Sequence, residues 1–331
     1  MQTGPSQPLA NRRACLLALG AAVIAAAARA QPRPSERPLR LVVPFTPGGS
    51  TDILARALAP KLALALGQNV VIDNKPGAGG SLGAGEVARA EPDGNTLLMG
   101  HIGTLAVNPA IYARLAYDPV KSFAPVAWVA RVPNVLVVGA NSPLKSFKEL
   151  IERARAQPGR LSYSSGGNGS AAHLTFEYLK LRTRTYLLHN PYRGTAPSVT
   201  DLIAGQVDAT FTGSPAVLPL LRAGRLRALA VSSALRIAAL PDVPTVAESG
   251  YPGFEADQWY GIVAPAGTPP ARLAQLNAEI NTALALPEVA QQLALEGALP
   301  MPGTPQAFAD LIQRELPRWA AVVKAGNVKA D

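Results

Sequence analysis

Short apolar segments alternate with helical segments along most of the chain, and this alternation limits the folds that it can adopt. Residues 41–45 are apolar at every position and predict a buried strand, and residues 53–65 carry leucines at helical spacing. Further strands are expected at 69–73 and 96–100, with a helix at 85–90 between them. Short strands and helices joined by brief loops predict an α/β fold with a mostly parallel sheet.

A second unit of the same kind begins near residue 135. Its expected strands are 135–139, 161–164, 186–189, 209–212 and 226–231, and its expected helices are 150–156, 170–181, 195–204 and 216–223. A return strand at 260–264 then precedes helices at 272–285 and 305–324. The chain therefore contains two α/β units followed by a return strand and C-terminal helices.

The order of these units predicts two domains. The strand near Val135 is expected to enter the second domain, and the strand near Ile262 to return to the first. Domain 1 is therefore expected to span residues 38–133 and 258–331, and domain 2 residues 134–257. Two chain crossings make a hinge with a cleft between the domains, and such clefts favour small ligands.

The N-terminus predicts export. Asn11-Arg12-Arg13 is positively charged, residues 14–28 are almost entirely apolar, and Ala28-Arg29-Ala30 matches a signal-peptidase site. We therefore expect residues 1–30 to be a cleaved signal peptide. A membrane anchor is the alternative, but the apolar run is shorter than the roughly 20 residues of a spanning helix. The paired arginines also leave a twin-arginine export route open.

Cysteine content and charge exclude several classes of protein. Cys15 is the only cysteine and would leave with the signal peptide, so the exported chain would have no disulfide and no thiolate. Three of the 31 basic residues would leave with it, against 22 acidic residues that stay. This modest basic excess is scattered and aromatic residues make up 5% of the chain, so no nucleic-acid partner is expected.

Two glycine-rich loops are the candidate ligand site, because each joins the end of a strand to the start of a helix. Backbone N–H groups and the positive dipole end at a helix start favour an anion, and glycines allow its close approach. A carboxylate held between two such loops would draw the domains together. The candidate residues in these loops are Gly48, Gly49, Ser50, Thr51 and Asp52 in domain 1, and Ser164, Ser165, Gly167, Asn168, Gly169 and Ser170 in domain 2.

An enzyme is the competing interpretation of the second loop. Gly167-x-Gly169-x-x-Ala172 after a strand resembles a dinucleotide fingerprint and would indicate an NAD-dependent oxidoreductase. The next strand, however, ends in His189-Asn190-Pro191 and lacks the acidic residue that binds the ribose. No cofactor and no catalytic residue are therefore expected. The three histidines are too isolated to predict a metal site, although His101 directly follows a strand and is placed to line the cleft.

Several motifs resemble those of one known family, the tripartite tricarboxylate transporter receptors, also called the Bug family. They occur in order from about Leu39 to the C-terminus. They include Val43-Pro44-Phe45-x-x-Gly48-Gly49-x-Thr51-Asp52, Asn74-Lys75-Pro76-Gly77-Ala78-Gly79-Gly80, Glu91-Pro92-Asp93-Gly94-x-Thr96-Leu97-Leu98, Pro191-Tyr192-Arg193-Gly194-x-x-Pro197 and Trp259-Tyr260-Gly261-x-x-Ala264-Pro265.

The resemblance implies a monomeric periplasmic solute-binding protein of the two-domain type II fold, with a hinge and an interdomain ligand cleft. It implies capture of a small carboxylate, a di- or tricarboxylate or an aromatic acid, for a membrane complex of one large and one small integral subunit. It adds Phe45, Gly80 and Ser81 to the candidate site. A ligand-presenting sensor for a membrane kinase remains an alternative, because no motif marks the surface that meets the partner.

One candidate position departs from the family pattern. Many members carry an acidic or amide residue after the strand at 209–211, where this chain has Thr212. Thr212 is therefore a candidate ligand contact, and the missing carboxylate disfavours an amino-acid ligand, whose ammonium group would need one.

Overall fold

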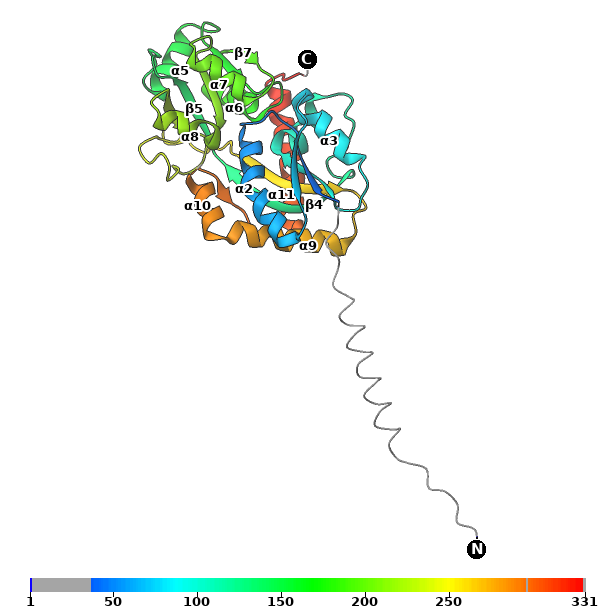
Figure 1. The fold of residues 1–331 in the computed structure, drawn as a ribbon. Coiled ribbons are helices and arrows are strands. Elements are labelled where there is room, and N and C mark those ends of the chain that lie inside the picture. The colour runs from blue at the N-terminus through cyan, green and yellow to red at the C-terminus, as the bar shows by residue number, and fades with distance from the viewer. Residues whose placement is uncertain (2–36, 296, 330–331) are drawn as a thin grey trace. The chain divides into compact units, whose positions relative to one another are not determined.

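Two mixed β-sheets with helices packed around them form the body of the protein (Figure 1). Besides Met1, the computed structural model describes residues 37–295 and 297–329. The predicted signal peptide and Cys15 lie outside the described residues. Among the helices of the described residues, none is both long and apolar enough to cross a bilayer.

The first sheet combines parallel strands from the N-terminal part with strands that return later. Its order is β11 (Leu299–Pro300), β4 (Phe123–Val132), β10 (Gln258–Pro265), β3 (Thr96–His101), β1 (Leu39–Val43) and β2 (Val70–Asn74). β1 is parallel to β2 and β3, whereas β10 is antiparallel to both β3 and β4.

The second sheet is built in the same mixed way. Its order is β7 (Leu188–Pro191), β6 (Ser162–Ser165), β8 (Ala209–Gly213), β5 (Asn134–Gly139) and β9 (Leu226–Val231). β6 is parallel to β7 and β8, whereas β5 is antiparallel to β8 and β9. The α/β fold class is confirmed, but the expectation of mostly parallel sheets is wrong. The strands that follow each crossing, β5 and β10, enter from the other sheet and run against their neighbours.

The helices follow the expected order, with differences at their ends. They are α2 (Ser50–Leu66), α3 (Ser81–Ala88), α4 (Asn108–Ile111), α5 (Phe147–Ala156), α6 (Ala171–Thr183), α7 (Thr195–Ile203), α8 (Ser214–Arg222), α9 (Pro270–Ala285), α10 (Pro287–Leu295) and α11 (Pro305–Ala325), with single turns η2 (Ala78–Gly80) and η3 (Gly103–Val107). α2 begins three residues before the expected Ile53 and α3 four residues before Gly85, so the glycine-rich loops continue directly into helices.

Neither β4 nor α10 was predicted from the sequence. β4 contains Pro125, which cannot donate to a ladder and argues against a strand in the sequence. The structure accommodates it opposite Val263, next to a register shift between Ile262 and Val263 of β10. Tertiary pairing with β10 therefore decides this segment.

The chain passes between the sheets twice. β4 ends at Val132 and β5 begins at Asn134, and residues 232–257 lead from β9 back to β10. We call the part that carries the first sheet (residues 37–133 and 258–329) the first-sheet region, and residues 134–257 the second-sheet region. These are the two crossings expected near Val135 and Ile262.

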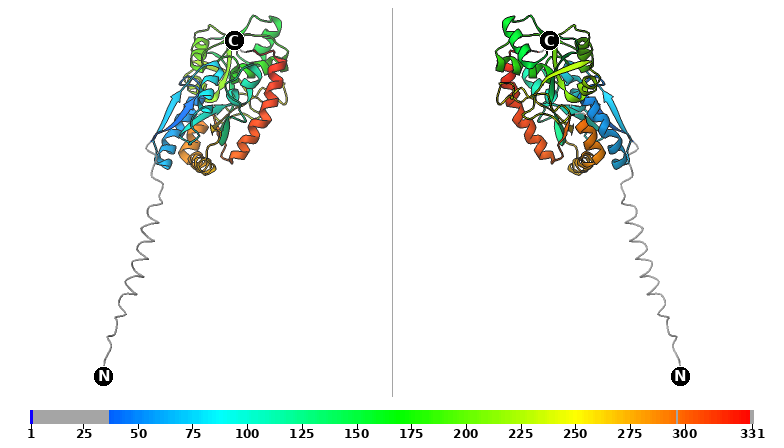
Figure 2. Two further views of the ribbon diagram at one scale, coloured as in Figure 1. Left: turned by 90° about the vertical axis from the view of Figure 1, so that its right-hand side faces the viewer. Right: turned by 90° about the vertical axis from the view of Figure 1, so that its left-hand side faces the viewer.

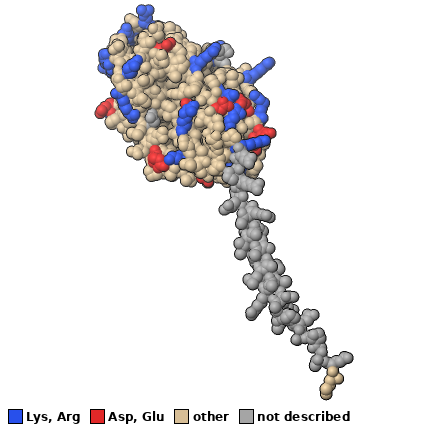
Figure 3. Space-filling model, viewed as in Figure 1, with Lys and Arg blue, Asp and Glu red and all other residues tan. Residues whose placement is uncertain are grey.

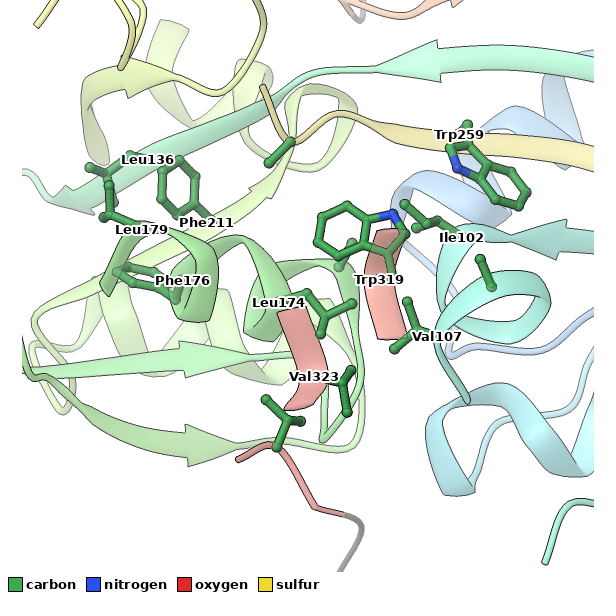
Figure 4. Packing of buried hydrophobic residues seen from close by; sticks show 14 of the residues in the cluster. Ile102, Val107, Leu136, Leu174, Phe176, Leu179, Phe211, Trp259, Trp319 and Val323 are labelled. Atoms are coloured by element: carbon green, nitrogen blue, oxygen red, sulfur yellow. The ribbon is translucent and has the colours of Figure 1, made fainter. Parts of the chain in front are cut away.

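The long C-terminal helix α11 packs against both regions. It contacts β4 and η3 of the first-sheet region and α6 of the second (Figure 2). Its Trp319 and Val323 lie between Leu174 of α6 and Val107 of η3 in one buried apolar cluster (Figure 4). The core is therefore continuous across the two regions on this side of the molecule.

The packing of α11 on β10 requires a glycine at position 261. A Cβ atom there would lie 2.2 Å from Cζ of Phe308, whose side chain is fully buried. We predict that Gly261→Ala lowers the free energy of unfolding by about 1–3 kcal/mol, the usual range for an overpacked core. Urea unfolding of the variant would measure the loss.

Gly303→Ala is the matched control, because its added Cβ would meet only Ala307 Cβ, at 4.0 Å. This control should change stability little. Equal stability of both variants and the wild type would contradict close packing between Gly261 and Phe308.

Candidate functional site

A small cavity lies where three helices begin, one from the first-sheet region and two from the second. We call it the inner cavity, and its volume is about 40 Å³. One water molecule needs about 10–15 Å³ of such space, so the cavity has room for a carboxylate group or a few waters. Its lining residues are Phe45, Thr46, Gly49, Ser50, Thr51, His101, Gly166, Ser170, Ala171, Ala172, Gly194, Thr195, Thr212, Gln258 and Tyr260.

Two of the three helix starts lack a side-chain cap. α2 has Gly49 and α7 has Gly194 at the N-cap, and neither cap provides a side-chain hydrogen bond. α6 differs, because the Ser170 hydroxyl accepts a hydrogen bond from His173 N–H. The first N–H groups of a helix have no partner within the helix. The inner cavity therefore faces three positive dipole ends, two of them without a side-chain oxygen to satisfy their amides.

A larger space, which we call the outer chamber, adjoins the inner cavity and has a volume of about 510 Å³. The two share the residues Phe45, Thr46, Gly166 and Gly194. The rest of the outer chamber is lined by Pro76, Gly77, Ala78, Gly79, Gly80, Tyr112, Gly167, Asn168, Tyr192 and Arg193. Its volume falls within the range of small-molecule sites, about 300–1,000 Å³.

The structure brings most of the sequence-predicted residues to these two spaces. The inner cavity receives Phe45, Gly49, Ser50, Thr51, His101, Ser170 and Thr212, and the outer chamber receives Phe45, Gly80, Gly167 and Asn168. Six predicted residues line neither space, namely Gly48, Asp52, Ser81, Ser164, Ser165 and Gly169. These six hold the lining in place. For example, Ser81 accepts a hydrogen bond from Asn108 and Ser164 accepts one from Ser198.

Asp52 anchors the first loop from within the protein. Its carboxylate accepts hydrogen bonds from Gly48 N–H at 3.0 Å, from Arg56 at 2.9 Å and from Asn74 at 3.0 Å. Burial alone raises the pKa of Asp52, but these hydrogen bonds outweigh it and hold the pKa below its ordinary value. Asp52 is therefore an ionised loop anchor, and its charge is already matched by Arg56.

A buried hydrogen-bond network forms the floor of the inner cavity. Gly103 N–H donates to His101 Nδ1 at 2.9 Å, so Nε2 carries the proton and donates to Gln258 Oε1 at 3.0 Å. Tyr260 donates to the same amide oxygen, and the Gln258 amide nitrogen donates to Asn134. Burial lowers the pKa of His101 to about 4, so its ring is neutral at pH 7. His101 therefore shapes the floor without contributing a charge.

Two further histidines contact the second glycine-rich loop, residues 164–170, through hydrogen bonds. His173 Nδ1 accepts from Gly169 N–H at 3.2 Å, and His189 Nε2 lies 2.6 Å from Ser165 Oγ. Their rings stack with centroids 3.9 Å apart. Burial lowers the pKa of His173 to about 4 and that of His189 to about 3, so both rings are neutral.

Direct contacts between the regions close the space around the inner cavity. A Cβ atom on Gly194 would lie 2.1 Å from Thr46 Oγ1, and one on Gly169 would lie 2.8 Å from Ile111 Cδ1. On the outer chamber, a Cβ atom on Gly79 would lie 3.1 Å from the Asn168 carbonyl oxygen. All three glycines have positive φ, between +60° and +123°. They are therefore required both for their backbone conformation and for the close approach of the two regions.

The third helix start and two floor residues, Gln258 and Tyr260, were missed in the sequence. Gly194 and Thr195 follow a strand and open a helix, which is the pattern that identified the other two loops. The sequence therefore contained the local pattern that would have identified this third helix start. Gln258 and Tyr260 gave none, because their strand borders the cavity only after the chain has crossed back between the sheets.

The lining is nearly free of charge. Among the described residues that line the two spaces, none is acidic and Arg193 is the one charged side chain. On the face shown in Figure 3, Lys and Arg are spread out and do not gather in one stripe. Within the described residues, no group of three or more His, Cys, Asp and Glu side chains could hold a metal ion.

The three neutral histidines make stability depend on pH. In the unfolded chain each titrates near 6.5, whereas in the folded protein the pKa values are about 4, 4 and 3 for His101, His173 and His189. Below pH 6.5 the unfolded state therefore binds more protons, and the free energy of unfolding should fall as the pH falls toward 4. Asp257 opposes this fall, because burial raises its pKa to about 6.

We predict that acidification from pH 7.5 to 5 lowers the free energy of unfolding by about 2 kcal/mol or more, since three groups outweigh one. Urea unfolding at the two pH values would measure the difference. His189→Gln should make the dependence shallower. Stability that is constant or higher at pH 5 would contradict the buried neutral histidines.

The sequence and the fold both match a known family. Residues 54–328 match the family described as the tripartite tricarboxylate transporter family receptor. The solved structure of the periplasmic binding protein BugD is 36% identical, covers 89% of this chain and 99% of its own, and has a TM-score of 0.85.

Two structures of R. palustris proteins are similar over the same range. Rpa4515, solved with adipate, is 40% identical with a TM-score of 0.87 and covers 89% of this chain and 99% of its own. MatC, solved with bound malate, is 37% identical with a TM-score of 0.83 and covers 87% of this chain and 99% of its own.

These matches decide the class of protein. The family consists of receptors, which contradicts the oxidoreductase alternative, and the family of periplasmic binding proteins implies a periplasmic location. The two-sheet α/β architecture is that of the solved members. The chain belongs to the tripartite tricarboxylate transporter receptor family and has the two-domain fold of its periplasmic solute-binding proteins.

Proposed function

We propose that this protein captures a small carboxylate and delivers it to a tripartite transporter with one large and one small membrane subunit. The observation that carries the proposal is the convergence of three helix N-termini on one cavity without an acidic lining residue. Such a site favours an anion through backbone N–H groups and aligned dipoles. A sugar or a cation gains nothing from this field.

The volumes of the two spaces indicate how the ligand lies. The inner cavity, at about 40 Å³, accommodates the carboxylate or its bridging waters but not a whole organic acid. The rest of the ligand therefore extends into the outer chamber, between Phe45, Thr46, Gly166 and Gly194. The relatives solved with adipate and malate support a carboxylate ligand.

The residues that meet at these spaces also support a hinged capture mechanism. We propose that residues 38–133 with 258–331 form one domain and residues 134–257 another, and that they close on the ligand by bending at the two crossings. The contacts of Gly194 and Gly169 across the cavity then belong to the closed arrangement. Export through the signal peptide at residues 1–30 would bring the receptor to its solute.

Protein purified from a periplasmic extract should be stabilised by carboxylates. We predict a clear rise in melting temperature with one class among malate, adipate, citrate and benzoate, and none with sugars. A ligand at 100 times its dissociation constant adds about 2.7 kcal/mol of stability. A thermal-shift screen makes the measurement, and NAD serves as the rival ligand. A rise with NAD alone would overturn the proposal.

Uptake in living cells separates transport from signalling. Cells that lack the protein should take up the stabilising carboxylate more slowly, and the intact gene should restore uptake. Normal uptake in these cells would favour the alternative role as a sensor for a membrane kinase.

The closed contact at Gly194 can be tested by adding one methyl group. Gly194→Ala places a Cβ atom 2.1 Å from Thr46 Oγ1, so the closed arrangement cannot form without strain. We predict that carboxylate affinity falls by about tenfold or more, because overpacking costs about 1–3 kcal/mol. Isothermal titration with the carboxylate from the screen would measure the loss.

The control for backbone strain is Gly250→Ala. Gly250 has a φ of +103°, close to the +123° of Gly194, but its added Cβ would have no atom within 4 Å. This variant should bind as the wild type does. If Gly194→Ala also bound normally, the contact with Thr46 would not be part of the bound form.

A further inference from the structure

Arg193 is the charged residue of the outer chamber, and its guanidinium has no partner among residues 37–295 and 297–329. No hydrogen bond or ion pair joins its side chain to another residue among those that the structure describes. The side chain is exposed. Most surface arginines near an acidic residue form ion pairs, as Arg236 does with Glu248 and Arg131 with Asp257. Arg193 therefore brings an unmatched positive charge to the chamber.

The backbone that carries Arg193 is held in place. Tyr192 N–H donates to the Ser165 carbonyl at 3.0 Å, and the Tyr192 hydroxyl donates to Asp201 at 2.7 Å. On its other side, Arg193 is followed by Gly194, the N-cap of α7. The loop is therefore attached to β6 and to α7, which both contribute to the second-sheet part of the site. The position of the Arg193 backbone at the outer chamber is therefore fixed.

The walls near Arg193 suit an uncharged ligand chain. Phe45, Pro76, Ala78 and Tyr112 line the same chamber and present aromatic and aliphatic surface. Polar attraction for a carboxylate is thus available at two places, the helix starts at the inner cavity and the guanidinium at the outer chamber. The apolar residues line the same chamber as the guanidinium. An elongated ligand with a carboxylate at each end and an apolar chain between them would use all three kinds of surface.

We propose that Arg193 binds the distal carboxylate of the ligand and thereby makes the protein selective for dicarboxylates over monocarboxylates. This inference rests on the proposed function, since the first carboxylate must occupy the inner cavity. Guanidinium and carboxylate can form two parallel hydrogen bonds, and these add geometric specificity to the charge attraction. Because the side chain is exposed, the effect on affinity is modest and is weakened by salt.

The test compares dicarboxylates of four to eight carbons with monocarboxylates of the same lengths, by isothermal titration. Wild-type protein should bind the best dicarboxylate about tenfold more tightly than its matched monocarboxylate. Arg193→Gln should remove most of that preference, because it should weaken dicarboxylate binding much more than monocarboxylate binding. Arg193→Lys should keep part of the preference, because lysine retains the charge but not the planar pair of donors.

Arg225→Gln is the matched control. Arg225 is exposed, lines neither space, and its loss changes the net charge equally. It should leave the preference intact, so that a general field effect is excluded. Equal loss of affinity for both ligand classes in Arg193→Gln, or a wild type without preference, would overturn the inference while the proposed function stands. Wild-type protein that binds neither class would instead overturn the proposed function itself.

Discussion

The hydrogen bond between the amides of Gln258 and Asn134 joins the two places where the chain crosses between the sheets. Asn134 is the first residue of β5 and Gln258 the first residue of β10. Both side chains are buried, and Asn134 also donates to Ala256 O and to Thr175, so its amide nitrogen and oxygen all have partners. An unpaired amide at this depth would be costly, and this hydrogen bond therefore holds the two crossings next to each other. The same Gln258 oxygen accepts from His101 and Tyr260, which makes the cavity floor part of that junction.

The cavity floor and the helix starts would have different roles in the proposed binding of an anion. The floor supplies neutral rings and amides, because burial keeps His101 uncharged. Positive potential comes instead from the starts of α2, α6 and α7, whose orientation is fixed by the strands before them. Backbone dipoles need no flexible side chain to be ordered when a ligand arrives, so each helix start is organised before the ligand binds. The glycines at 169 and 194 allow the two regions to meet closely enough to enclose it.

The candidate site was only partly readable in the sequence, for identifiable reasons. The loops at 48–52 and 164–170 were found because strand, glycine and helix follow one another locally, and the third loop at Gly194 carries the same signal. Asp52 and Ser165 looked like ligand contacts but face inward, since each satisfies backbone groups of its own loop. The direction in which a loop side chain points depends on the hydrogen-bond partners that the folded protein places next to it. The strand β4 was missed because Pro125 weakens a local pattern that pairing with β10 overrides.

By itself, the sequence determined the α/β class, the order of strands and helices, the two crossings and the family, because these depend on local periodicity and on motifs within short segments. It also determined that glycines would stand at the helix starts. Only the tertiary structure decided that the sheets are mixed, that α11 spans both regions, and that Gln258 and Tyr260 form the cavity floor. These features join residues that are far apart in the chain. Their contacts depend on how crossing strands pair and on how closely two regions approach, and no local pattern records either.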